Sequence, residues 1–170
     1  MGQMFAFVPL MAIPSLEVTQ NVEVAEMPAT KTEVSTKELR QEKADKINAY
    51  FKDRSMPLKG TGMTFVLVAE KYGLDWRLLP AIAVRESSGG KNACGYNPFG
   101  WGSCKLNNYS SFEQAIESVG KHLGGAIPST AKYYAGKSSM EKLYYYNGTV
   151  IPTYPTEVLA IMKKIETYSD

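Results

Sequence analysis

Apolar residues recur at intervals of three and four along most of the chain after residue 34, which is the spacing of one helix face. The repeat is clearest in a segment whose apolar positions are Phe112, Ile116, Val119 and Leu123. The same kind of repeat predicts six helices, over 35–52, 63–72, 76–88, 110–124, 138–148 and 155–165. Strand and helix patterns do not alternate, so we expect a mainly α domain with at most a small hairpin near 95–109.

Capping residues set the expected helix boundaries. Ser35 and Glu38 have the spacing of a capping box, which predicts that the first helix begins at Ser35. Asp75 is the expected N-cap of the third helix, and Gly89 and the glycine after it are its expected end. Pro155 is expected at the first position of the last helix. An aromatic segment over 131–137 is expected between helices rather than within one.

The chain before residue 35 has a different character from the rest. Met4–Ile13 is apolar apart from Pro9 and is shorter than the roughly 20 residues that span a bilayer. It resembles the apolar part of a secretory signal or an anchor remnant, although no basic residue precedes it. Residues 14–34 contain prolines and no helical repeat, which predicts a flexible linker. We therefore expect an apolar N-terminus and linker over 1–34 and one folded domain over 35–170.

The apolar stripe of the third expected helix continues into a carboxylate. Glu86 shares a helix face with the apolar residues Leu78, Leu79, Ile82 and Ala83. A carboxylate on such a stripe loses solvation, which favours its protonated form. Glu86 is therefore a candidate general acid. The simpler interpretation is that Glu86 ends the helix and bonds nearby backbone groups or Arg77.

Two short motifs after this helix resemble a known family. The RESSGG turn, followed by NPFGWG, resembles the lysozyme-like superfamily. The resemblance is closest to the mannosyl-glycoprotein endo-β-N-acetylglucosaminidase-like domains of bacterial autolysins and flagellar muramidases, and next to lytic transglycosylases. These families share a Glu-Ser turn at a helix end, whose glutamate is the catalytic acid, and then an Asn-x-Phe-Gly loop. The resemblance covers about Ala44 to Ile165.

This resemblance implies a lysozyme-like fold and cleavage of β-1,4 bonds between N-acetylhexosamines in peptidoglycan, with neither a cofactor nor a metal. Glu86 would be the catalytic acid. The YYYNG segment resembles a transglycosylase segment whose tyrosine faces the acid, so Tyr146 is a second catalytic candidate unless it is simply a core tyrosine. The substrate-binding residues that the resemblance implies are Ser87, Ser88, Tyr96, Asn97, Phe99, Gly100, Trp101 and Asn147.

A second catalytic carboxylate is not evident. Glycosidases usually use two, but no Asp or Glu occurs from Ser87 through Phe112. Glu113 and Glu117 belong to the polar face of the next helix, which leaves Glu141 as the remaining candidate. Lytic transglycosylases use a single glutamate because a hydroxyl of the substrate is the nucleophile. Hydrolysis and transglycosylation both stay open, and a non-catalytic peptidoglycan-binding module of the same fold is the alternative.

The cysteines and charges bear on location and partners. Cys94 and Cys104 bracket the NPFGWG loop and are expected to form a disulfide, which favours an extracytoplasmic protein. His122 is the single histidine, which argues against a zinc site and against a cysteine peptidase.

The net charge is +2, with −3 over residues 1–34 (four glutamates against one lysine) and +5 over the rest. A mildly basic domain suits an anionic polymer such as a cell wall. No dense basic stripe indicates nucleic acid, and a monomer is expected.

Overall fold

The computed structural model describes residues 31–103 and 108–168 of the chain, with side chains from residue 33 onward. Within these residues the protein is mainly α-helical and contains no strand, only an isolated bridge between Cys94 and Asn97. The α-helices are α1 (Lys31–Asp53), α2 (Gly62–Lys71), α3 (Leu78–Ser87), α5 (Phe112–Leu123), α6 (Pro128–Tyr134), α7 (Ser139–Leu143) and α8 (Tyr154–Glu166). A π-helical turn, η1 (Tyr144–Gly148), follows α7 directly.

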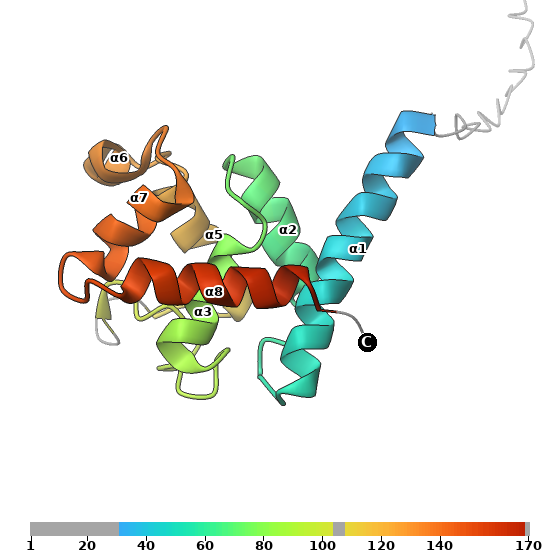
Figure 1. Ribbon diagram of the computed structural model, residues 1–170, viewed down its shortest axis with the longest axis horizontal. Helices are drawn as coiled ribbons and strands as arrows, with labels where there is room; N and C mark the ends of the chain where they lie inside the picture. The colour runs from blue at the N-terminus through green and yellow to red at the C-terminus, as the bar shows by residue number, and fades with distance from the viewer. Residues whose placement is uncertain (1–30, 104–107, 169–170) are drawn as a thin grey trace, which may run out of the picture.

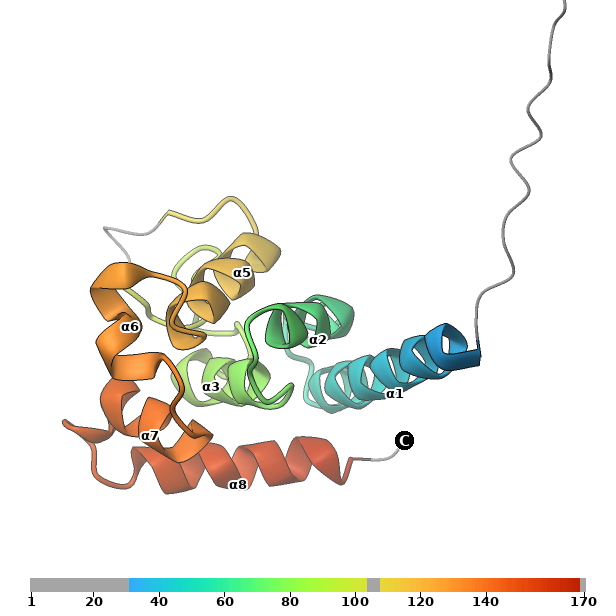
Figure 2. The same cartoon turned by 90° about the horizontal axis from the view of Figure 1, so that it is seen from above.

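Helix α3 lies at the centre of the fold. It packs against α8 on one side and against α2 and α5 on the other (Figure 1, Figure 2). Every residue from Leu78 to Ala83 is buried, so this part of α3 is enclosed all round rather than along one stripe. Polar residues begin only near its C-terminal end, with Arg85 and Glu86. The position of α3 therefore brings Glu86 to the edge of the core.

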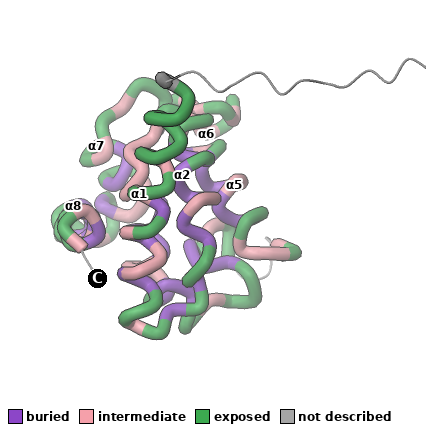
Figure 3. The backbone as a smooth tube through the Cα atoms, turned by 90° about the vertical axis from the view of Figure 1, so that its right-hand side faces the viewer, coloured by how far each residue is buried: buried purple, intermediate pink, exposed green. Residues whose placement is uncertain are grey.

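Helix α1 begins earlier than the capping box predicted. It starts at Lys31, which places Ser35 inside the helix, so the expected start at Ser35 was wrong. No proline or glycine occurs between residues 29 and 56, and nothing there stops the helix from extending toward its N-terminus. Residues 33–39 are exposed and project from the domain, whereas burial begins at Ala44 (Figure 1, Figure 3). Neither α1 nor any other described helix is long and apolar enough to cross a membrane.

Two further boundaries differ from the sequence-based expectation. Residues 128–134 form α6, although an irregular aromatic segment was expected there; Pro128, in the first turn, needs no hydrogen-bonded N–H. Helix α3 begins at Leu78, and its N-cap residue is Arg77 rather than Asp75. Asp75 instead accepts a hydrogen bond from the Arg77 N–H at 2.9 Å, and so caps the turn before the helix.

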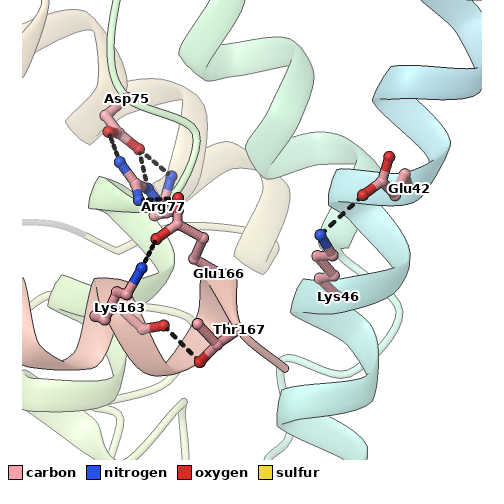
Figure 4. Close-up of polar contacts among 7 residues, drawn as sticks. All are labelled: Glu42, Lys46, Asp75, Arg77, Lys163, Glu166 and Thr167. Carbon is pink, nitrogen blue, oxygen red and sulfur yellow. Dashed lines mark hydrogen bonds and ion pairs between the residues drawn. The ribbon is translucent and has the colours of Figure 1, made fainter. Parts of the chain in front are cut away.

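Arg77 connects this turn to the end of the last helix. Its guanidinium binds Asp75 and, at 2.8 Å, Glu166 near the C-terminus of α8 (Figure 4). Lys163 pairs with Glu166 from the same helix at 2.8 Å. The partly exposed Arg77–Glu166 pair therefore links α8 to the start of α3. The Lys163–Glu166 pair joins two residues within α8, as the Glu42–Lys46 pair in the same view joins two residues within α1.

A buried lysine positions the segment that carries η1. The Lys142 ammonium group donates to the Leu123 carbonyl at 2.9 Å and to the Tyr134 carbonyl. These carbonyls belong to the last residues of α5 and α6, where the helix dipoles favour a cation. Burial lowers the pKa of Lys142 from its ordinary value, with a smaller opposing effect of Glu141. Lys142 therefore connects α7 and η1 to the ends of two other helices.

Asn48 on α1 caps the following helix. Thr61, the N-cap residue of α2, makes no side-chain capping bond. The Asn48 side-chain oxygen instead accepts hydrogen bonds from the N–H groups of Gly60 and Gly62, each at 2.9 Å. A Cβ atom at Gly62 would lie 2.3 Å from the Ala44 carbonyl oxygen, so only glycine allows this approach of α1 and α2.

Replacing Asn48 tests this cap. Asn48→Ala leaves two N–H groups without their partner and should lower the free energy of unfolding by about 1–2 kcal/mol. Asn48→Asp keeps an acceptor oxygen and adds a charge that the helix N-terminus favours, so its stability should stay near that of the parent. Denaturant unfolding of the three proteins makes the comparison. Equal destabilisation by both substitutions would show that the cap does not contribute.

Candidate active site

A pocket of about 260 Å³ lies where α3, the loop after it and η1 meet. Six of the residues singled out from the sequence line it together with Gly102: Glu86, Phe99, Gly100, Trp101, Tyr146 and Asn147. Two larger hollows, of about 490 and 500 Å³, lie along α1. Neither contains a candidate residue, and the larger of them is lined by residues 33–41 of the projecting helix alone. The smaller pocket is therefore the candidate active site.

Glu86 is held by a tyrosine from the last helix. The Tyr154 hydroxyl donates to Glu86 Oε1 at 2.6 Å, across the contact between α3 and α8. The Oε2 atom makes no hydrogen bond to another described residue and lies 3.8 Å from the position that a Cβ atom on Gly100 would take. Gly100 has a φ of +62°, which favours glycine. One oxygen of the carboxyl group is thus fixed, and the other faces the loop that lines the pocket.

Glu86 does not bond Arg77 in the structure, so this part of the simpler interpretation was wrong. Arg77 is engaged by Asp75 and Glu166 (Figure 4). The arginine close to Glu86 is its neighbour Arg85, whose side chain pairs with Glu157 at 2.5 Å. This bond to Glu157 is the main cause that raises the pKa of Arg85, and Glu86 adds a smaller contribution.

Tyr154 is a site residue that the sequence reasoning missed. It is the first residue of α8 and is fully buried, with its ring stacked on Tyr146 at a centroid distance of 5.9 Å. Burial raises the pKa of the Tyr154 phenol far above its ordinary value, with smaller effects of Tyr146 and Glu86. The hydroxyl therefore stays protonated and acts as a donor.

A signal for Tyr154 exists in the sequence. The last helix was expected to begin at Pro155 and to turn Val158, Leu159, Met162 and Ile165 inward; Val158, Met162 and Ile165 are buried along one stripe. Helix α8 begins one residue earlier, and Tyr154 extends this stripe by one turn toward the N-terminus. The stripe marks Tyr154 as a core residue, but it does not indicate which group its hydroxyl meets.

Tyr146 lies on the π-helical turn beside the pocket. Its hydroxyl donates to the Phe99 carbonyl at 2.7 Å, which joins η1 to the loop after α3. Burial raises the pKa of Tyr146 well above its ordinary value, with a smaller effect of Glu86. The wider π-helical turn, a feature frequent at functional sites, presents both Tyr146 and Asn147 to the pocket. The catalytic role expected for Tyr146 stays a prediction.

Ser87 and Asn97 support the pocket from behind rather than line it. Ser87 is buried, and its hydroxyl lies 2.8 Å from the Pro98 carbonyl while it accepts a bond from the Gly90 N–H at 3.0 Å. Asn97 is also buried, and its amide donates to the Trp101 carbonyl at 2.9 Å. Both residues were expected to bind substrate. In the structure they hold the loop of residues 97–102 against the end of α3.

Ser88 and Tyr96 do not line the pocket. Ser88 is an exposed residue with a φ of +53° at the end of α3. The Tyr96 side chain is exposed, and its ring packs edge-on against Phe112 at 5.3 Å. Cys94 is disulfide-bonded and so offers no free thiol; its expected partner, Cys104, lies outside the described residues.

No second acid among the described residues lines this pocket. Glu141, the remaining candidate, forms a capping box with Ser138 at the start of α7. Glu117 binds Lys71 and Tyr72. Nowhere in the described part of the chain do three or more His, Cys, Asp or Glu residues gather as a metal site would require. Glu86 is thus the single acidic group of the pocket as described.

His122 packs behind the pocket wall. Its ring lies 4.8 Å from the ring of Trp101, and its Nδ1 atom lies 3.0 Å from the Thr130 hydroxyl. The ring centroids of Tyr134 and Tyr146 lie 6.2 and 5.5 Å from that of Trp101. Burial lowers the pKa of His122, so the neutral ring is the form that packs here.

This packing predicts a pH dependence of stability. Because the pKa of His122 is lower in the folded protein than in the unfolded chain, the unfolded chain binds more protons at mildly acidic pH. The stability from neutral His122 is fully present above the unfolded pKa of about 6.5 and is lost as the pH falls through the folded pKa. Between pH 7 and pH 5, the thermal midpoint should fall further in the parent than in His122→Gln. Equal falls would contradict this.

Comparisons with known proteins find no match for this chain: no family model, no curated protein and no solved structure. The resemblance to lysozyme-like enzymes therefore stays an expectation from the sequence, and the function is argued from the geometry of the pocket.

Proposed function

We propose that this protein cleaves the glycan strands of peptidoglycan at a β-1,4 bond between N-acetylhexosamines, with Glu86 as the general acid. The observation that carries the proposal is the geometry of the Glu86 carboxyl group. Tyr154 holds Oε1 at 2.6 Å, and Oε2 lies beside Gly100, which lines the pocket. The motifs around Glu86 add the substrate class, through their resemblance to glucosaminidases and lytic transglycosylases.

The Tyr154 hydrogen bond favours one location for the acidic proton. Because Oε1 accepts the Tyr154 hydrogen, a proton on Glu86 is best placed on Oε2. A glycosidic oxygen seated over Gly100 would then receive this proton as its bond to the sugar breaks. The carboxylate left behind keeps its hydrogen bond from Tyr154. This hydrogen bond stabilises the charge that develops on Glu86 during the reaction.

The lone acid favours lytic transglycosylation over hydrolysis. An inverting hydrolase needs a second carboxylate to activate water, and a retaining hydrolase needs one as nucleophile. In transglycosylation a hydroxyl of the sugar itself attacks the carbon whose bond has broken. The Glu86 carboxylate then takes the proton of that hydroxyl, so one group serves as acid and then as base. The products would carry anhydro ends, which mass spectrometry of released muropeptides distinguishes from the reducing ends of hydrolysis.

A wall-binding module without catalysis is the second candidate. No second acid lines the pocket in the described part of the chain, which favours this candidate because the same geometry could bind a strand without cutting it. Either function would act outside the cytoplasm, and the disulfide at Cys94 supports that location.

Glu86→Gln separates the two candidates. The glutamine keeps the size of the side chain and an oxygen for Tyr154, but it has no proton to deliver. Cleavage of purified sacculi should fall by about two to four orders of magnitude, while the thermal midpoint stays at or above that of the parent. Retained cleavage would overturn the proposal. An inactive parent that still binds sacculi would identify the binding module instead.

Tyr154→Phe tests how Glu86 is held. The phenyl ring keeps the stack on Tyr146, and only the hydrogen bond to Oε1 is lost. A hydrogen bond to a charged group contributes about 1.5–3 kcal/mol, so kcat should fall roughly 10- to 100-fold with little change in KM. Tyr146→Phe is the matched control, because its hydroxyl bonds the Phe99 carbonyl instead. A larger loss of kcat in Tyr146→Phe would assign the reacting role to that tyrosine.

A further inference from the structure

Three tyrosines form an exposed aromatic surface next to the pocket. Tyr133 on α6 and Tyr144 and Tyr145 on η1 have 40%, 49% and 39% of their surface exposed. The ring of Tyr145 lies 5.5 Å from that of Tyr133 and 5.4 Å from that of Tyr144. We call these three residues the tyrosine platform. The mechanism above does not use them.

The platform is contiguous with the pocket wall. The ring centroid of Tyr133 lies 6.3 Å from that of Tyr134, which in turn lies 6.2 Å from that of Trp101. Trp101 lines the pocket. On the other side, η1 carries both the platform residue Tyr145 and, directly after it, the pocket residue Tyr146. A long ligand that leaves the pocket beside η1 would therefore lie close to the platform.

Two lysines give the platform a positive charge. The Lys132 ammonium group lies 4.8 Å from the ring centroid of Tyr133, and that of Lys137 lies 5.4 Å from the ring centroid of Tyr145. Neither lysine forms an ion pair with another described residue. The acid whose charge interacts with Lys137 is Glu141, which is bonded to Ser138. The lysines are thus available to an anionic ligand.

We infer that the tyrosine platform binds the peptidoglycan strand beyond the bond that is cut, with its rings on sugar faces and Lys132 and Lys137 near the carboxylates of the stem peptides. Tyrosine suits a sugar face because its ring is apolar and its hydroxyl is polar. The lysines select an anionic glycan over a neutral one. This inference rests on the proposed function and deepens it, since the substrate becomes a long anionic strand rather than a short oligosaccharide.

Binding measured without turnover tests the platform. In the Glu86→Gln protein, which cannot cut the strand, Tyr133→Ala with Tyr145→Ala should weaken co-sedimentation with purified sacculi about tenfold. Tyr133→Phe with Tyr145→Phe keeps the rings and should bind as the Glu86→Gln protein does. Both tyrosines are exposed, and thermal midpoints check that each variant is folded. Unchanged affinity in a folded alanine variant would overturn the inference.

A second pair of variants tests the charge and does not depend on the tyrosines. Lys132→Gln with Lys137→Gln should weaken binding to sacculi and reduce its dependence on salt, while binding of a neutral chitin oligomer stays the same. Equal binding of sacculi before and after this change would remove the lysines from the inference.

Vesicles of anionic phospholipid are the remaining arm of the test. No binding that depends on the platform is expected there. Platform-dependent binding to vesicles, with unchanged binding to sacculi, would assign this surface to membranes instead and overturn the inference.

Because these measurements need no cleavage, loss of sacculus binding in the alanine variant would support the platform even if the parent cuts no bond. Cleavage by the parent with no effect of the platform would instead support the proposed function alone.

Discussion

The candidate site depends on the hydrogen bond from Tyr154 to Glu86. It crosses the contact between α3 and α8 and determines which carboxyl oxygen is held and which faces the pocket. The rest of the fold maintains this contact. Helix α3 is enclosed up to Ala83, so it cannot easily shift, and Arg77 holds the far end of α8 through Glu166. A carboxyl group placed by two packed helices is better oriented than one on a free loop.

The loop of residues 97–102 completes the pocket, and three polar side chains hold it in place. Ser87 contacts it from the end of α3, Asn97 bonds within it, and Tyr146 bonds it from η1. These residues do not need to touch a substrate to matter for its binding. The same π-helical turn that provides Tyr146 also exposes Tyr145, so the pocket and the tyrosine platform share one element. Lys142 holds that element against the ends of α5 and α6.

Helix ends differed from expectation where another interaction, local or distant in sequence, took the place of the expected cap. Ser35 and Glu38 match a capping box, but a helix without a nearby proline or glycine continues past such a pair. Asp75 accepts a hydrogen bond from the N–H of Arg77, which lies in the turn before α3 rather than in the helix. Asn48, which caps α2, lies 14 positions away from Gly62, beyond the reach of any capping motif.

The sequence by itself determined most of the helices and the place of Glu86 at the end of an apolar helix, and the resemblance of its motifs to a known family named six of the residues that line the pocket. These follow from spacings of three and four residues and from a short motif, which are local properties of a chain. Only the tertiary structure decided that Tyr154 holds Glu86 and that Ser87 and Asn97 support the loop from behind. Tyr154 and Glu86 are 68 positions apart, and the partner of a buried hydroxyl depends on how helices pack, which no local pattern specifies.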